Sequence, residues 1–169
     1  MHTKNKNINF QILKKQFDGD LVWDISTLIQ YATDASAYRE IPDAVALPNT
    51  KSDLTNLINF AKQYGIPLVP RTAGTSLAGQ VVGKGIIVDF SKYWGKIIEL
   101  NEKEHWIRVE PGVILDELNL YLKQFGLFFG PETSTSNRCM IVGMVSNNSC
   151  GSHSILYGST RDHTLSVKM

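Results

Sequence analysis

Two stretches of the chain repeat apolar residues with the period of a helix that buries one face. The first places them at i, i+3, i+4 and i+7, namely Leu54, Leu57, Ile58 and Ala61. Thr50 precedes this stretch as an N-cap, and Asp53 follows three residues later as a capping-box partner. Gly65 ends the pattern, and Pro67 prevents its continuation. The sequence therefore predicts a helix between Thr50 and Gly65.

The second helical stretch is Val113–Phe125, where apolar residues share one side and Gly126 follows as the terminator. A short helix is also predicted over Asn7–Phe17, ended by Gly19. Residues 31–48 are expected to be irregular at first and then extended between prolines.

Strands are predicted where apolar residues cluster over short runs: Ile66–Val69, Gly85–Phe90, Ile97–Leu100 and Trp106–Glu110. The polar residues Asn101–His105 would join the last two runs as a hairpin. The final residues, Asp162–Met169, alternate in the manner of a strand. Helices and strands together make the chain α+β.

Composition narrows the class of protein. With 169 residues, 43% of them hydrophobic and 20% charged, the chain is expected to form one ordinary globular domain or two small ones. A net charge of +1, without a run of Lys or Arg, argues against nucleic acid as a partner. No membrane span is expected, and residues 1–17 lack the apolar core of a signal peptide, so we expect a cytoplasmic protein. Cys139 and Cys150 are expected to be reduced and buried.

A run of small residues lies within Pro67–Gln80 (PLVPRTAGTSLAGQ). Small side chains allow the backbone to approach a ligand closely, and a glycine such as Gly74 allows successive N–H groups to point inward. This geometry suits an anion such as a phosphate. An ordinary surface turn has the same composition, and the run by itself leaves both interpretations open.

Two familiar phosphate-binding motifs do not fit. Gly79–Gly85 (GQVVGKG) is one residue short of a P-loop and has glycine where the Mg²⁺-binding hydroxyl belongs. Gly83 and Gly85 precede a strand and lack the third glycine of a Rossmann fingerprint.

A third pattern matches at two places. Pro70–Gly79 (PRTAGTSLAG) resembles the R-G-G-G-T-S-L-x-G loop in the FAD-binding domain of the vanillyl-alcohol oxidase/p-cresol methylhydroxylase superfamily. Pro131–Gly151 resembles the P-[DE]-T-S…GGM…NN-x-x-G segment of the same superfamily. YATDASAY at 31–38 and the closing Tyr157–Asp162 are similar to the branch that holds D-lactate, glycolate and D-2-hydroxyglutarate dehydrogenases. The resemblance covers about residues 20 to 169.

The resemblance implies FAD as the cofactor and a two-subdomain PCMH-type fold whose second subdomain is truncated at the C-terminus. Residues 1–19 are then an N-terminal extension with a helix. Residues 20–169 are the N-terminal part of the FAD-binding domain, and the chain is expected to belong to a larger flavoprotein.

The resemblance also implies two sets of cofactor-binding residues. Backbone N–H groups and hydroxyls of the first loop would hold the pyrophosphate: Arg71, Thr72, Ala73, Gly74, Thr75, Ser76 and Leu77. The second segment would line the other wall: Pro131, Glu132, Thr133, Ser134, Thr135, Ser136, Asn137, Gly143, Met144, Val145, Ser146 and Asn147. An ordinary surface arginine remains an alternative for Arg71. Thr72, Ala73 and Val142 replace glycines of the family pattern.

The chemistry implied is oxidation of a small 2-hydroxy acid by hydride transfer to the flavin, while a base takes the hydroxyl proton. No base is identified here: His2 falls at the chain start, His105 in the hairpin turn, and His153 and His163 are expected to be structural or exposed. In the relatives a separate C-terminal domain handles the substrate, so the chain alone is expected to be inactive. Neither a metal site nor iron–sulfur cysteines are expected in it, although a fused iron–sulfur module is possible elsewhere.

Some superfamily members attach the flavin covalently through a histidine in the first loop. Thr75 stands at that position, and a threonine hydroxyl without an adjacent base is a poor nucleophile, so non-covalent FAD is expected. Two alternatives remain. One keeps the fold with other chemistry, as in alkyl-glycerone-phosphate synthases or enolpyruvyl reductases, and the other is a flavin-binding module without turnover.

Overall fold

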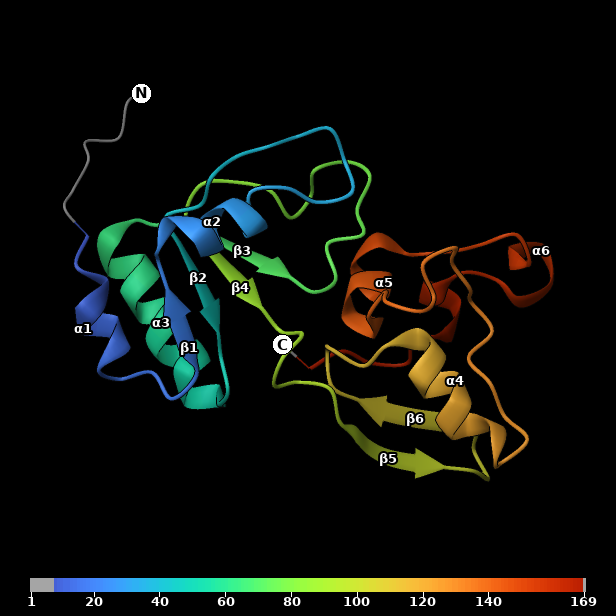
Figure 1. Cartoon of the computed structure of the whole chain (residues 1–169). Coiled ribbons are helices and arrows are strands. Elements are labelled where there is room, and N and C mark those ends of the chain that lie inside the picture. Colours follow the sequence, from blue (N-terminus) through green and yellow to red (C-terminus); the bar gives the residue numbers. More distant parts are fainter. Residues whose placement is uncertain (1–7, 169) are drawn as a thin grey trace. The chain divides into compact units, whose positions relative to one another are not determined.

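The computed structural model describes residues 8–168, which divide into two compact units (Figure 1). Of these residues, the first unit comprises 8–70 together with Ser76–Asp89, and the second comprises Arg71–Thr75 together with 90–168. Predictions for His2 and Asn7 lie outside the described residues.

The first unit is a sheet with helices. Its elements are α1 (Phe10–Lys14), β1 (Asp20–Val22), α2 (Ile25–Tyr31), β2 (Ala44–Leu47), α3 (Lys51–Tyr64), β3 (Leu68–Arg71) and β4 (Ile86–Asp89). The strands form a four-stranded sheet in the order β1-β2-β4-β3. β1 pairs antiparallel with β2, and β2 pairs parallel with β4, with Val45 opposite Ile87.

The core of the first unit lies on the two central strands. All residues of β4 are buried, and Val45 and Ile87 pack on one face against Leu28 of α2. Because side chains alternate across a strand, the buried Ala46 and Val88 point to the opposite face. Helices therefore cover both faces of the sheet, as its apolar central strands require.

Helix α3 begins and ends where the sequence predicts. Thr50 and Asp53 form the capping box, and Gly65 ends the helix in a left-handed conformation with φ of 67°. The buried Asp53 carboxylate also accepts backbone N–H groups from Asp18 and Gly19, besides those of Asn49 and Thr50. Burial alone raises the pKa of Asp53, but these donors outweigh it and hold the pKa below its ordinary value.

The second unit is a hairpin with helices. Its elements are β5 (Ile97–Asn101), β6 (Trp106–Val109), α4 (Leu115–Lys123), α5 (Ile141–Asn147), α6 (Ser154–Tyr157) and the 3-10 turn η1 (Thr160–His163). β5 and β6 pair antiparallel, as predicted. Val113, Leu118 and Leu122 form a buried cluster against apolar side chains of this hairpin.

Two predictions about the second unit are wrong. The predicted strand at residues 162–169 does not form over its described part, residues 162–168: Ser159 and Asp162 cap η1, and residues 164–168 pair with no strand in the part of the chain that the structure describes. Alternation alone cannot make a strand without a partner. Cys150 is exposed, whereas Cys139 is buried as expected, and both are free thiols.

Several elements were not predicted. No sequence pattern predicted β1, α2 or α6, or α5, which lies within the Pro131–Gly151 segment. Conversely, the predicted N-terminal helix shortens to α1, with Asn9 as its N-cap.

Candidate functional site

The first small-residue loop leaves the end of β3 and turns at Gly74, where φ is +66°. The Arg71 guanidinium folds back over this glycine: a methyl group in place of its hydrogen would lie 2.6 Å from Nη2 of Arg71. Both residues belong to the second unit. A positive charge therefore lies directly against the residue around which the loop turns.

The backbone donors of this loop are not used by the protein. The N–H groups of residues 72–77 donate no hydrogen bond to any residue within 8–168. Unpaired N–H groups and a guanidinium are donors that an anion such as a diphosphate satisfies. These donors suit that group chemically, and the individual binding residues stay a prediction.

Ser76 differs from its neighbours in the loop. Its side chain is buried, and its hydroxyl donates to Oε1 of Gln80 at 2.7 Å and accepts from the N–H of Ala78. The hydroxyl thus closes the following turn inside the first unit, which leaves the backbone N–H as the donor that Ser76 offers.

The second segment, residues 131–137, is held against the start of α4. Helix α4 has no side-chain cap. Instead, the carbonyls of Ser136 and Cys139 accept the N–H groups of Asp116 and Leu115 at 3.1 Å each. The segment therefore satisfies helix donors that would otherwise lack partners, and this fixes its path.

The side chains of the second segment differ in exposure. Pro131 is buried, Ser134 and Asn137 are exposed, and Thr133 Oγ1 lies 3.2 Å from both Thr135 Oγ1 and the Cys139 sulfur.

Helix α5 brings Gly143 against the first loop. A methyl group at Gly143 would lie 3.0 Å from Oγ1 of Thr72, so these two residues, both of the second unit, are in close contact. Met144 points the other way, into a buried cluster with Leu115 and Cys139. The structure thus joins two predicted site segments at Thr72 and Gly143, but it places the Met144 side chain in the core.

The remaining predicted residues of α5 lie nearer the surface. Val145 is half-buried, and Ser146 and Asn147 are exposed near the C-terminal end of the helix.

Glu132 is hydrogen-bonded to the turn at residues 151–153, about twenty residues further along the chain. Its Oε1 accepts from Ser152 Oγ at 2.8 Å and from His153 Nδ1 at 2.6 Å. The hydrogen bonds from His153 and then Ser152 hold the pKa of Glu132 below its usual range. In the sequence, the one indication of this contact is that residues 151–154 (GSHS) contain side chains that can donate hydrogen bonds.

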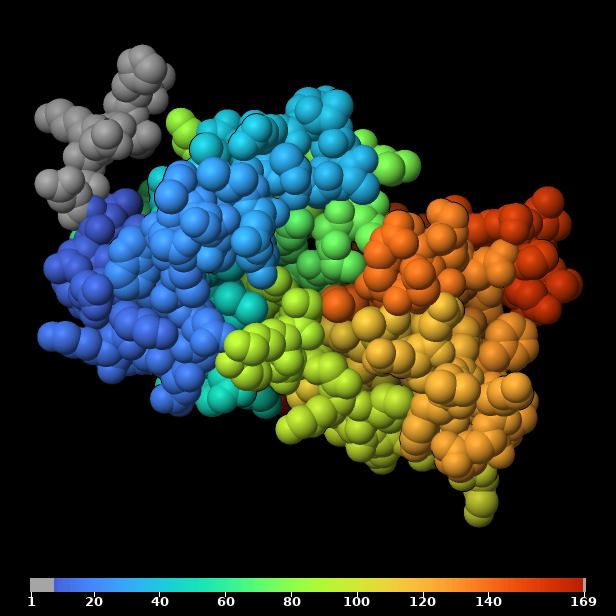
Figure 2. Space-filling model, in the orientation of Figure 1, coloured from blue at the N-terminus to red at the C-terminus, as the bar shows by residue number. Residues whose placement is uncertain are grey.

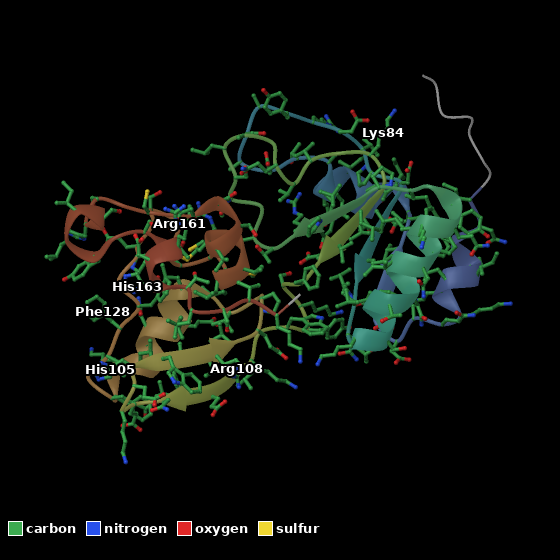
Figure 3. The ribbon with its side chains drawn as sticks, turned by 180° about the vertical axis from the view of Figure 1, so that it is seen from behind. Lys84, His105, Arg108, Phe128, Arg161 and His163 are labelled. Atoms are coloured by element: carbon green, nitrogen blue, oxygen red, sulfur yellow. The ribbon has the colours of Figure 1, made fainter. Side chains whose placement is uncertain are left out.

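His105 and His163 are both exposed. His105 lies at the turn of the β5–β6 hairpin (Figure 3) with φ of 55°. Nε2 of His163 lies 2.6 Å from the carbonyl oxygen of Tyr157, and its ring packs edge-on against Phe129.

A hollow of about 400 Å³ opens in the first unit between residues 38–40 and 78–84. These two segments lie next to each other at the surface in Figure 2. Lys84 and Glu40 pair across it at 3.8 Å.

No group of three or more His, Cys, Asp or Glu side chains within residues 8–168 could hold a metal ion. None of the helices described is long and apolar enough to cross a membrane.

Comparison with known proteins identifies the protein family of this chain. Residues 42–169 match the model of the FAD binding domain family, and the chain belongs to this family. The cofactor prediction of FAD is thereby confirmed, while the mode of attachment and the individual binding residues stay predictions.

The relatives that match this chain are several times longer than it. The D-2-hydroxyglutarate dehydrogenase of Escherichia coli K12 is 43% identical over 166 residues, which are 95% of this chain and 16% of that protein. The mitochondrial D-lactate dehydrogenase [cytochrome] of Kluyveromyces lactis is 33% identical, over 76% of this chain and 23% of that protein. The chain thus spans about one sixth of its bacterial relative.

Solved structures confirm the predicted fold. An alkyldihydroxyacetonephosphate synthase superposes with a TM-score of 0.81 at 19% identity, over 98% of this chain and 33% of that one. A p-cresol methylhydroxylase superposes with a TM-score of 0.70 at 18% identity, over 84% and 28% of the two chains. The chain has the PCMH-type FAD-binding fold.

Proposed function

We propose that the chain is the FAD-binding part of a flavoprotein dehydrogenase that oxidises a small D-2-hydroxy acid. The observation that carries the cofactor half of this proposal is the first loop, where the N–H groups of residues 72–75 donate to no described residue and the Arg71 guanidinium lies against Gly74. The substrate half rests on identity of 43% to a D-2-hydroxyglutarate dehydrogenase and 33% to a D-lactate dehydrogenase.

The role proposed for the residues of this chain is to bind FAD and to orient it. Backbone donors of the first loop would hold the pyrophosphate, with Arg71 balancing its charge. Gly143 would admit close approach beside Thr72, and residues 131–137 would line a wall of the site. FAD, when bound, supplies the hydride acceptor, and no described residue is assigned as the base.

FAD would be held without a covalent bond. Thr75 stands where a histidine is the point of attachment in some superfamily members, and it has no hydrogen-bonded base among the described residues. A fused iron–sulfur module and a cytoplasmic location stay predictions. The likeness to alkyldihydroxyacetonephosphate synthase, at 19% identity, supports the fold alone and does not favour that chemistry.

The test uses the full natural protein that contains this chain. Flavin absorbance of the purified protein establishes the cofactor, and dye reduction is then followed with the D and L forms of 2-hydroxyglutarate and lactate. We expect oxidation of a D-hydroxy acid. A flavoprotein that reduces the dye with none of these acids would overturn the substrate proposal, and a colourless protein that does not take up added FAD would overturn the cofactor site.

A further inference from the structure

Glu132 was expected to line the cofactor wall, but its carboxylate is directed to the turn at residues 151–153. One oxygen, Oε1, accepts both the Ser152 hydroxyl and Nδ1 of His153. Both donors lie about twenty residues away in sequence, so the contacts join two separate segments of the second unit. One of its two carboxylate oxygens is thus already engaged within the protein.

The backbones of the two segments also fit each other. A side chain at Gly151 would collide with the carbonyl oxygen of Glu132 and would lie 2.8 Å from its Cγ. The turn is closed on itself, because Gly151 N donates to Ser154 Oγ and that hydroxyl donates to the Gly151 carbonyl. A hydrogen-bonded turn therefore packs directly against the start of the 131–137 segment.

Electrostatics disfavours a direct contact between Glu132 and the cofactor. FAD carries a diphosphate, and a carboxylate placed against it would repel it. His153, by contrast, gives the carboxylate a hydrogen-bond donor, and its charged form gives it a counter-ion. Among the described residues, His153 is the titratable group in contact with the Glu132 carboxylate.

We propose that Glu132 is a positioning residue, whose carboxylate ties residues 151–153 to the 131–137 segment and so holds that wall in its FAD-binding conformation. This inference rests on the proposed FAD site. The carboxylate acts as a hydrogen-bond acceptor for Ser152 and His153, and it does not touch the cofactor.

The experiment compares variants in the full natural protein. Glu132→Leu removes the acceptor, Glu132→Gln keeps an acceptor oxygen but loses the charge, and His153→Phe removes one donor. Glu99→Leu is the control, because Glu99 forms an ion pair of similar exposure with Arg108 on the β5–β6 hairpin (Figure 3). Each variant is assayed for FAD affinity and for amide hydrogen exchange at residues 151–154 without FAD.

We expect Glu132→Leu to weaken FAD binding by roughly threefold to tenfold, the range of one or two exposed charged contacts, and to speed exchange at the turn. Glu132→Gln should retain most of both properties. His153→Phe alone should produce part of the loss in FAD affinity. It should add little in the Glu132→Leu background, because both changes break the same Glu132–His153 contact. Glu99→Leu should change neither property.

A pH series adds a further readout. Because the pKa of Glu132 is lowered on folding, the contact is present above its ordinary range and is lost as the pH falls through the lowered value. Exchange at the turn, taken relative to the intrinsic rate at each pH, should accelerate there in the wild type and not in Glu132→Gln.

Three results would overturn the proposal. These are unchanged exchange in Glu132→Leu, additive losses in the double variant, or tighter FAD binding in Glu132→Gln, which would mean that the carboxylate faces the diphosphate. If the wild type binds no FAD, the proposed function fails. The exchange data then decide separately whether Glu132 holds the turn.

Discussion

Gly74→Ala is the sharpest test of the first loop, because it adds one methyl group at a defined place. Gly74 has φ of +66°, and the added methyl would lie 2.6 Å from Nη2 of Arg71. Nη2 is the end of a flexible side chain, so we expect the guanidinium to swing away while the loop backbone stays in place.

The expected magnitude has two parts. A left-handed conformation costs an L-residue roughly 1–2 kcal/mol, and the reduced freedom of the unfolded chain returns about 0.4–1 kcal/mol. Stability should therefore fall by about 1 kcal/mol. Displacing Arg71 removes a charge-assisted hydrogen bond to the diphosphate, worth about 1.5–3 kcal/mol, so FAD affinity should fall roughly tenfold to a hundredfold.

Gly126→Ala is the matched control. Gly126 has φ of +67°, but a methyl group there meets no atom within 4 Å. It therefore carries the same backbone strain without any effect on Arg71. Urea unfolding of the apo protein measures the first part of the effect, and titration of FAD with flavin fluorescence measures the second.

The two variants should lose similar stability, and Gly74→Ala alone should lose affinity. In an Arg71→Ala background, Gly74→Ala should weaken FAD binding little further, since the guanidinium is already gone. Equal FAD affinities of Gly74→Ala and Gly126→Ala would refute the reasoning, because the position of Arg71 over the glycine would then be irrelevant to the cofactor.

Two further predictions concern stability and attachment. Asp53→Asn should lower the free energy of unfolding by about 3 kcal/mol, because its buried carboxylate accepts four backbone N–H groups that one amide cannot satisfy. Since its pKa is lowered, Asp53 contributes stability that is complete above the ordinary Asp value and is lost as the pH falls through the lowered one, so the variant should lack that part of the acid dependence in urea melts. Acid precipitation of the full natural holoprotein should release its yellow colour to the supernatant, because Thr75 is a poor nucleophile toward the flavin.

Controls separate these effects. Asp24→Asn keeps an acceptor oxygen at the exposed N-cap of α2 and removes only its charge, so it should destabilise the protein less than Asp53→Asn. Equal losses from the two variants would contradict the importance of the buried acceptor. Flavin that stays with the washed acid pellet would show covalent attachment.

The elements that the sequence predicted correctly depend on short-range chemistry. Helix α3 follows from Thr50, Asp53 and Gly65, which act within their own helix. The β5–β6 hairpin likewise follows from two apolar runs and the polar connection between them. The first loop could be located because its small residues are adjacent in the chain and resemble a family motif.

Tertiary structure decided what depends on distant partners. Asp53 is a helix cap by sequence, but only folding brings it the N–H groups of Asp18 and Gly19. Helix α5 has a composition typical of a loop, and it is helical because Met144 packs in the core and the carbonyls of Pro111 and Val113 accept its first N–H groups.

The same division holds within the site. Sequence placed Glu132 and Gly143 in a cofactor wall by resemblance, but it contained no sign that Glu132 is bound by Ser152 and His153 or that Gly143 meets Thr72. The alternating residues 164–168 fail as a strand for the corresponding reason, since a strand needs a neighbour. Local propensities act over a few residues, whereas hydrogen bonds and packing between distant segments exist only once the chain has folded.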